Sequence, residues 1–167
     1  MRYAVISDIH SNLESLTTFF KLIKNLKINK LICLGDLVGY NPNPNECIKY
    51  ISSIVNLEII RGNHDRAVVY SDYLDFSDYA KEAVKWTIRT LTGESMDYLK
   101  SLVKGPRIID NTFAACHGSL VDEDNYLLSK HYTVEDFNWL IKNKIQLSFF
   151  GHTHYQIAFS LDDEGAI

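Results

Sequence analysis

Short apolar runs alternate with amphipathic stretches along the first third of the chain. Residues 3–6, 31–34 and 57–60 are runs of the length that buried strands take. Between them, residues 13–26 carry apolar side chains at three- and four-residue spacing, and residues 48–55 repeat that spacing at Ile48, Ile51 and Val55. Strand, helix, strand, helix, strand is the order of a parallel sheet, so the pattern predicts an α/β fold with a βαβαβ core.

The rest of the chain continues the same alternation. Residues 78–104 predict two helices separated by a glycine, and residues 108–116 predict one strand. Thr133-Val-Glu-Asp136 resembles a capping box with Asp in the last place, which would open a helix through Ile141. Residues 147–150 predict a last strand. No repeat or linker interrupts the pattern, so we expect a single domain over residues 1–167.

Composition places the chain among ordinary globular proteins, with 167 residues of which 46% are hydrophobic and 23% charged. Seventeen basic and 21 acidic residues give a net charge of −4, so we expect no binding to long nucleic acid. Three scattered cysteines fit a reducing compartment rather than a disulfide framework. The apolar runs are too short for a signal peptide or a membrane span, so we expect a cytoplasmic protein without a membrane partner. The oligomeric state stays open.

Polar residues of a chemically distinctive kind follow five of the predicted strands. In chain order they are Asp8 and His10, Asp36, then Asn63, His64 and Asp65, then His117, and finally His152 and His154. Ligands of open α/β sheets bind beyond the carboxyl ends of the strands, so we expect these side chains to converge. Imidazoles with carboxylates suit Mn²⁺, Fe²⁺ or Zn²⁺, and the absence of cysteine from the set argues against a structural zinc site.

Each of these motifs taken alone has an ordinary explanation. An Asp-X-His triplet or a Gly-Asn-His-Asp segment is also typical of a turn, and Gly-His-Thr-His can be two exposed histidines. Their joint occurrence after successive apolar runs favours a metal site. Because Asp8 and His10 are two positions apart on an extended strand, we expect them to point the same way. Without His64 and Asp65, the remaining four histidines, two aspartates and one asparagine exceed the needs of one ion, which favours two ions sharing a carboxylate.

In combination, the motifs resemble those of the calcineurin-like metallophosphoesterase superfamily. The superfamily pattern of D-x-H, G-D-x-x-G, G-N-H-[DE], H and G-H-x-H is matched by Asp8-Ile-His10, Gly35–Gly39, Gly62–Asp65, His117 and Gly151–His154. More narrowly, the chain resembles the small bacterial and archaeal phosphoesterase group, which includes phosphodiesterases and dinucleoside polyphosphate hydrolases. The resemblance implies a metallophosphatase-like β-sandwich flanked by helices.

The resemblance also implies how two divalent ions are held. The expected ion is Mn²⁺, with Fe, Zn, Ni, Co or Mg as alternatives. By analogy with the family, one ion is held by Asp8, His10 and His154, the other by Asn63, His117 and His152, and Asp36 bridges the two.

A hydrolytic reaction follows from this likeness. A metal-bridging hydroxide would attack the phosphorus of a small phosphodiester, a phosphomonoester or a dinucleoside polyphosphate. Family analogy makes His64 a phosphate contact or the proton donor to the leaving group, with Asp65 orienting its ring and Asn63 near the substrate. Arg61 is either a substrate-phosphate contact or a surface arginine.

Some features depart from the family pattern or stay outside the site. Protein serine/threonine phosphatases carry Asp-Arg-Gly after the second motif, and Gly39-Tyr40-Asn41 stands here, so that activity is the weaker alternative. A metal-binding scaffold with impaired catalysis is the other. The chain stops soon after Gly-His-Thr-His, where relatives usually continue, so we expect the C-terminal part of the fold to be incomplete. We expect Cys116 to be a core side chain and Asp122–Asp124 a solvated loop.

Overall fold

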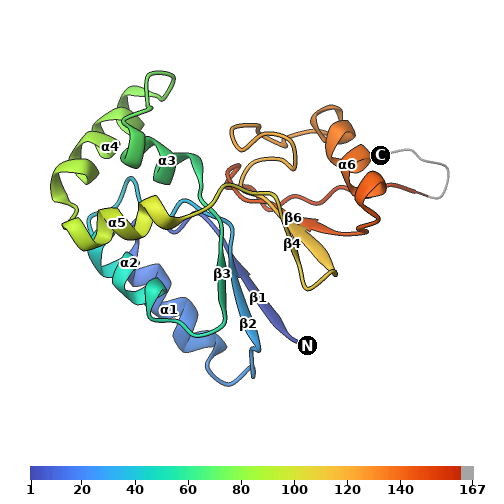
Figure 1. Cartoon of the computed structure of the whole chain (residues 1–167), viewed down its shortest axis with the longest axis horizontal. Coiled ribbons are helices and arrows are strands. Elements are labelled where there is room, and N and C mark those ends of the chain that lie inside the picture. Colours follow the sequence, from blue (N-terminus) through green and yellow to red (C-terminus); the bar gives the residue numbers. More distant parts are fainter. Residues whose placement is uncertain (163–167) are drawn as a thin grey trace.

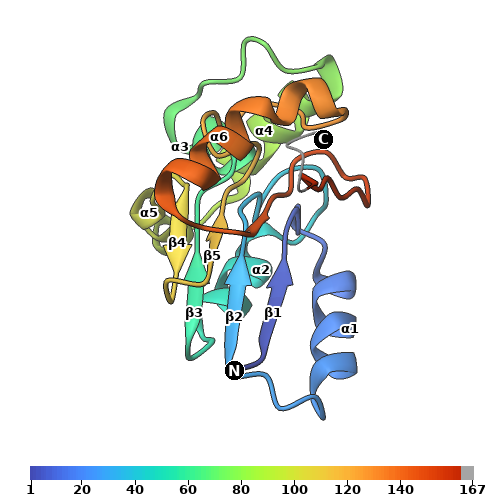
Figure 2. The ribbon, with the colours of Figure 1, turned by 90° about the vertical axis from the view of Figure 1, so that its right-hand side faces the viewer.

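The computed structural model describes residues 1–162 and has two small sheets packed face to face between helices (Figure 1). The first sheet contains β1 (Tyr3–Ile6), β2 (Lys30–Cys33) and β3 (Leu57–Ile59), all parallel and in that order. Figure 2 shows the three strands running the same way. Their carboxyl ends therefore meet at one edge of the sheet, as expected from the βαβαβ pattern.

Five helices pack on one face of this sheet, on the left in Figure 1. Amphipathic spacing and N-terminal caps explain where several of them begin: Asn12, Ser77 and Thr92 each accept a hydrogen bond from a backbone N–H in the first turn that follows. The five are α1 (Leu13–Ile23), α2 (Pro44–Ser52), α3 (Asn63–Tyr70), α4 (Asp78–Thr90) and α5 (Gly93–Ser101).

The second sheet contains β4 (Arg107–Ile109), β5 (Phe113–Ala115) and β6 (Ser148–Phe149). Strand β5 is antiparallel to β4 and parallel to β6. A 3₁₀ turn, η1 (Lys130–Thr133), leads into α6 (Val134–Asn143), which covers the outer face of this sheet (Figure 1). The order helices, sheet, sheet, helix confirms the predicted α/β sandwich flanked by helices. No helix among residues 1–162 is long and apolar enough to cross a membrane.

Alternation along β2 divides the core into two layers. Leu31 and Cys33 face the helices, whereas Ile32 and Leu34 face the second sheet, where they pack with Ile109. A strand buried on both faces needs apolar residues at every position, which explains the uninterrupted run at 31–34. Residues along β5 likewise alternate between the core shared by the two sheets and the core beneath α6. Cys116 belongs to the latter and packs with Leu140 of α6.

The structure corrects the single strand predicted over residues 108–116. A tight turn at Asp110 and Asn111, with φ of 47° and 54°, folds this stretch into the β4–β5 hairpin. Aspartate and asparagine tolerate this left-handed conformation, which lets the three residues 110–112 connect the two strands. The apolar residues on either side of that pair concealed the turn.

One helix boundary and one expected cap also differ from the prediction. Helix α2 ends at Ser52, and Val55 lies beyond it with 83% of its surface exposed. The expected capping box at α6 is absent among the described contacts: Thr133 Oγ1 donates to the Lys130 carbonyl, and Asp136 accepts from the Leu120 backbone N–H at 2.7 Å. Asp136 therefore ties α6 to the loop after β5 instead of capping its own helix.

Candidate metal centre

The predicted ligands meet where the carboxyl ends of the strands point. Each of three groups offers nitrogen and oxygen atoms that all lie within 4.8 Å of one another. The groups are Asp8, His10 and His154; His10, Asp36 and His64; and Asp36, His117 and His152. Because they share His10 and Asp36, the three groups form one continuous cluster. Residues from both sheets contribute to it.

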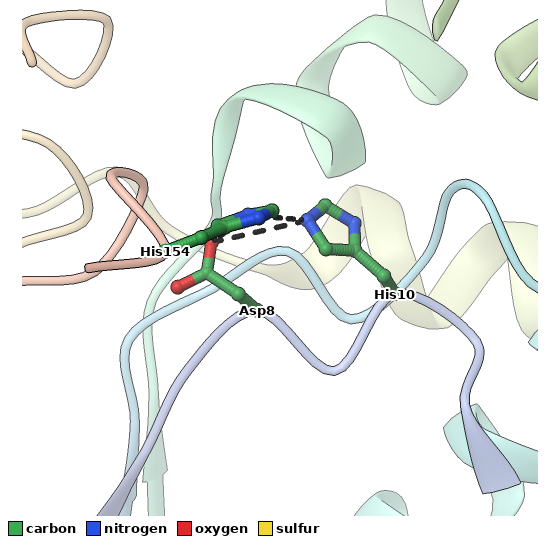
Figure 3. A group of neighbouring side chains, drawn as sticks. All are labelled: Asp8, His10 and His154. Atoms are coloured by element: carbon green, nitrogen blue, oxygen red, sulfur yellow. Dashed lines mark hydrogen bonds and ion pairs between the residues drawn. The ribbon is translucent and has the colours of Figure 1, made fainter. Parts of the chain in front are cut away.

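The first group joins the loop after β1 to the segment after β6 (Figure 3). His154 Nε2 lies 3.4 Å from Asp8 Oδ1 and 3.1 Å from His10 Nε2. His10 Nδ1 lies 3.0 Å from the Val38 carbonyl, to which it donates. Nε2 of a neutral His10 ring therefore carries the free lone pair, and it points into the group, which is the arrangement that metal-binding histidines adopt.

The group of Asp36, His117 and His152 is more deeply buried and repeats this arrangement. His117 Nδ1 donates to the Leu34 carbonyl at 2.9 Å, so Nε2 faces the site. Nε2 lies 2.9 Å from Asn63 Oδ1 and 3.3 Å from Asp36 Oδ2. The same Asp36 oxygen lies 3.6 Å from His10 Nε2. The Asp36 carboxylate, 1% exposed, thus lies near a ring nitrogen of the first group and one of this group.

His152 closes the cluster from the second sheet. Its backbone N–H donates to both carboxylate oxygens of Asp8, at 3.1 and 3.0 Å. The centroid of its ring lies 5.0 Å from that of His117. The ring also packs against Tyr126, with 3.9 Å between the centroids of His152 and Tyr126. Nε2 lies 3.2 Å from the Asp124 carbonyl. His152 is therefore fixed both through its backbone and through its ring.

The donor set fits a divalent cation. Nε2 of His10 and His117 are acceptors when the rings are neutral, yet they face carboxylate and amide oxygens in a buried site. Acceptors facing acceptors need a proton or a cation between them. Nitrogen and oxygen ligands without cysteine are the set that borderline divalent metals take.

The charges of His117 and Asp36 are coupled. Burial by itself lowers the pKa of His117, but the negative charge of Asp36 and the hydrogen bond to it outweigh burial and raise that pKa to about 9. Burial likewise raises the pKa of Asp36, but the opposing charge of His117 holds it below its usual range. In the metal-free chain, a proton on His117 supplies the positive charge that the site requires.

His64 lies between the cluster and a group of aromatic side chains. Its backbone N–H donates to Asp36 Oδ1 at 2.8 Å, and its ring centroid lies 4.7 Å from those of Tyr40 and Phe76. Nδ1 is buried and has no hydrogen-bond partner among residues 1–162. Burial lowers the pKa of this ring to about 4, although the charge of Asp36 opposes the effect. The imidazole is therefore neutral at pH 7.

Asp65 contacts backbone groups rather than the ring of His64. Its Oδ1 accepts from the N–H groups of Leu37 and Val38, at 2.9 and 3.2 Å, and its Oδ2 accepts from that of Gly62 at 3.0 Å. Among the described residues, the expected contact with the imidazole is absent. Asp65 instead joins the start of α3 to the loop after β2, which positions His64 through the backbone.

Several candidate ligands adopt a strained backbone. Asp8, His10, Asp36, His152 and His154 have φ between 47° and 65°. This left-handed conformation costs roughly 1–2 kcal/mol for a residue with a Cβ, and such strain concentrates at functional sites. The finding corrects the expectation that Asp8 and His10 share one face of a strand, because β1 ends at Ile6. A looped backbone, and not strand alternation, turns both toward His154.

Close backbone approach explains a motif glycine. A Cβ at Gly62 would overlap Oδ1 and the backbone nitrogen of Asp36. The lack of a side chain at Gly62 therefore lets the start of α3 reach Asp36, so that His64 can donate to it.

The basic residues beside the site form a partly buried ion-pair cluster. Glu123 Oε1 lies 3.2 Å from Arg61 Nη2 and 2.7 Å from Arg66 Nη1, and Glu123 is only 5% exposed. Asp122–Asp124 is thus a solvated loop only in part. Arg61 is directed at Glu123, and its guanidinium lies 5.7 Å from the Tyr70 ring centroid. Arg66, which sequence reasoning missed, lines a cavity of about 620 Å³ that also borders Asn63, His64 and His152.

Comparison with known families bears on this arrangement. A family model described as calcineurin-like phosphoesterase matches residues 1–156. The chain belongs to the calcineurin-like phosphoesterase family. Together with the clustered side chains, membership indicates divalent metal binding. The resemblance stated from the motifs is confirmed.

Individual relatives agree with the family assignment. The uncharacterized protein MJ0912 of Methanocaldococcus jannaschii is 37% identical over 170 residues, covering 97% of this chain and 65% of that protein. A metallophosphoesterase structure from Sphaerobacter thermophilus has 33% identity and a TM-score of 0.75, over 92% of this chain and 61% of that one. The hypothetical protein PH1004 from Pyrococcus horikoshii OT3 has 25% identity and a TM-score of 0.79, over 92% and 69%. The chain thus spans less than two thirds of the length of the first two.

Proposed function

We propose that the chain hydrolyses phosphate esters with two divalent ions. Asp8, His10 and His154 would hold one ion, Asn63, His117 and His152 the other, and Asp36 would bridge them. The observation that carries the proposal is the position of Asp36 Oδ2, which lies 3.6 Å from His10 Nε2 and 3.3 Å from His117 Nε2. One carboxylate oxygen in reach of two ring nitrogens from separate groups supports a shared ligand.

The chain's own residues have separate tasks in this proposal. When bound, the two cations supply a water of lowered pKa and positive charge near the phosphoryl oxygens. His64 is held by its backbone bond to Asp36, and its neutral ring has one N–H to offer. An anionic phosphate beside the ring raises its pKa, so a proton for the leaving oxygen becomes available when substrate binds. Asp65 fixes the turn that carries His64.

The finer assignments follow from the donor set and the charge of the chain. We assign Mn²⁺ as the ion, a small phosphodiester, phosphomonoester or dinucleoside polyphosphate as the substrate, and the cytoplasm as the compartment. Nitrogen and oxygen ligands support Mn²⁺. The net charge of −4 supports a small substrate over a long nucleic acid, and three free, buried cysteines support a reducing compartment. The guanidinium of Arg61 forms an ion pair with Glu123, so we assign Arg61 an indirect role in substrate binding and no contact with the phosphate.

Metal content and turnover, measured on the same sample, test the proposal. The protein is loaded with Mn²⁺, freed of unbound ion and analysed for metal, and hydrolysis of bis-p-nitrophenyl phosphate is followed. We expect about two ions per chain and hydrolysis that a chelator abolishes and added Mn²⁺ restores. Two ions without hydrolysis would make the chain a metal-binding scaffold, and fewer than two would refute the ligand assignment.

A further inference from the structure

A cavity of about 620 Å³ lies next to the candidate metal centre, and some residues of that centre form part of its lining. Asn63, His64 and His152 line the cavity and also belong to the cluster of predicted site residues. A phosphate held at that cluster therefore places its organic group in this cavity. The chemistry of the remaining walls decides which organic group fits.

Aromatic rings form much of the lining. Tyr40 and Phe76 both contact the ring of His64, and Tyr126 packs on His152. Tyr40 and Tyr126 are each about half exposed, at 49% and 53%. Exposed ring surface beside a binding site offers a stacking partner to a planar group. The rings are therefore suited to an aromatic part of the ligand.

The charged residues of the lining are mainly acidic. Asp72, Asp75 and Asp124 face the cavity together with one cation, Arg66. The guanidinium of Arg66 is already occupied: Nη1 lies 2.8 Å from Asp124 and 2.7 Å from Glu123, and Nε lies 3.2 Å from Asp72. A paired guanidinium leaves little attraction for a further anion on the ligand.

Asp75 contributes a carboxylate that no cation neutralises. It forms no ion pair or hydrogen bond within residues 1–162, and it belongs to the exposed loop between α3 and α4. A negative charge on the ligand at roughly 6 Å from one carboxylate loses about threefold in affinity in a water-like medium, and several carboxylates multiply the loss.

We propose that this cavity selects phosphate esters whose organic group is aromatic and carries no further negative charge. The inference rests on the proposed function, and it narrows the substrates considered there. Phosphodiesters and phosphomonoesters of aromatic alcohols or nucleosides are favoured. Dinucleoside polyphosphates are disfavoured, because their additional phosphates would lie against the acidic wall.

Phosphonates test this selection because their carbon–phosphorus bond is not cleaved by ester hydrolysis. Benzylphosphonate, ethylphosphonate and 4-carboxybenzylphosphonate differ in aromatic surface and in one negative charge. Their binding to the Mn²⁺-loaded protein is measured by calorimetry at fixed free Mn²⁺ and ionic strength. We expect benzylphosphonate to bind about fivefold more tightly than ethylphosphonate, and about fivefold to tenfold more tightly than its carboxylated analogue.

Matched variants locate the effect in the cavity. Asp75→Asn should reduce the preference for benzylphosphonate over the carboxylated analogue about threefold, whereas Asp97→Asn, the same change on an exposed residue of α5, should leave it unaltered. Tyr126→Ala should reduce the preference for benzylphosphonate over ethylphosphonate. Tyr132→Ala, an equal truncation of an exposed ring outside the cavity, should not.

The outcomes separate this inference from the proposed function. Equal binding of all three phosphonates, no binding of any, or equal effects of Asp75→Asn and Asp97→Asn would overturn the inference even if bis-p-nitrophenyl phosphate is hydrolysed. The expected preferences in a protein that binds Mn²⁺ but hydrolyses no phosphate ester would instead support the cavity and overturn the proposed function.

Discussion

Single carboxylates and imidazoles in the cluster have different partners, and these partners determine what each substitution does. Asp36 is placed between the two groups of candidate ligands, and it also accepts the backbone N–H of His64. Asp36→Asn keeps an acceptor for that N–H but removes the negative charge. We expect the variant to fold and to lose both Mn²⁺ ions together, because the shared charge offsets two cations.

Calorimetric titration with Mn²⁺ checks this prediction for Asp36. The wild type should take up two ions per chain, and Asp36→Asn should weaken both binding steps by at least tenfold. Asp97→Asn, which removes the same charge from the exposed surface of α5, is the control and should titrate as the wild type does. Loss of one ion with normal retention of the other would assign Asp36 to a single ion.

His64 should act in the reaction without holding an ion. His64→Asn is expected to keep near-normal Mn²⁺ content while turnover falls by about 10² to 10⁴, the usual contribution of a positioned proton donor. The fall should be largest for esters with poor leaving groups, because a nitrophenolate departs without a proton. Turnover of a series of aryl and alkyl esters, with metal analysis of the same samples, measures both effects.

His117→Asn is the companion of that experiment. His117 Nε2 faces Asp36 and Asn63, so its loss should lower metal affinity, and excess Mn²⁺ should partly restore turnover for every ester. If excess Mn²⁺ rescues His64→Asn in the same way, His64 is a ligand. If His64→Asn lowers turnover equally for good and poor leaving groups, its ring contacts the phosphate and is not an acid.

The sequence predicts the identity of these residues better than it predicts their contacts. Each candidate ligand follows a strand, and the convergence of strand ends is a property of the fold, so the cluster could be expected. The partners of Asp65 could not, because they are backbone groups of a loop in left-handed conformation. Arg66 was missed because its role depends on its position in α3. The polar motif at the start of that helix resembles a turn, so the helix was not predicted.

At the level of elements, the start of α3 is the most tightly constrained junction. Gly62 precedes the helix, and a Cβ there would overlap the backbone and the carboxylate of Asp36. Gly62→Ala should therefore reduce the free energy of unfolding by about 1–3 kcal/mol, the range for overpacking. Because α3 would shift from Asp36, Mn²⁺ affinity should fall as well. Urea denaturation and Mn²⁺ titration measure the two effects.

Gly93→Ala is the matched control for that substitution. Gly93 is the first residue of α5, its φ is not positive, and no heavy atom lies within 4 Å of a Cβ built there. We expect it to leave Mn²⁺ affinity unchanged and to stabilise the protein by about 0.4–1 kcal/mol, as alanine does at sites compatible with it. Equal destabilisation by both substitutions would show that the crowding at Gly62 is relieved by small shifts.

Regular elements of the first sheet were predictable because pattern and packing agree there. Strand β2 is buried on both faces and its sequence is apolar throughout, so no alternative element competes. Helix α3 and the β4–β5 hairpin were missed for opposite reasons. The helix begins with polar site residues, and the hairpin turn interrupts an otherwise apolar stretch by only three residues.

Across the whole molecule, the cluster connects the two sheets. Asp8, His10 and Asp36 follow strands of the first sheet, whereas His117, His152 and His154 follow strands of the second. A direct link exists without any ion, since the His152 backbone N–H donates to Asp8. Ions held by residues from both sheets bind only when the sheets are packed, so metal binding should stabilise the whole fold.

We expect a rise in pH to lower the Tm of the metal-free protein but to increase the stabilisation that Mn²⁺ provides. The pKa of His117 is raised from 6.5 to about 9 in the folded, metal-free chain. Its ion pair with Asp36 therefore contributes fully below about pH 6.5 and is lost as pH rises toward 9. We expect the Tm of the metal-free protein to fall over this range. Mn²⁺ competes with the proton on His117, so its affinity should rise with pH.

Thermal unfolding between pH 6 and 8.5, with and without Mn²⁺, measures both slopes. At a fixed free Mn²⁺ concentration equal to a hundred times the Kd at pH 8.5, each ion stabilises the fold by about 2.7 kcal/mol, which corresponds to a Tm increase of roughly 5–10 °C per ion for a chain of this length. That increase should be smallest at pH 6 and grow toward pH 8.5. In His117→Asn, both pH dependences should flatten because the titrating ring is gone. A metal-free Tm that stays constant from pH 6.5 to 8.5 would show that His117 is neutral in the folded chain, and the opposition between proton and metal would then be wrong.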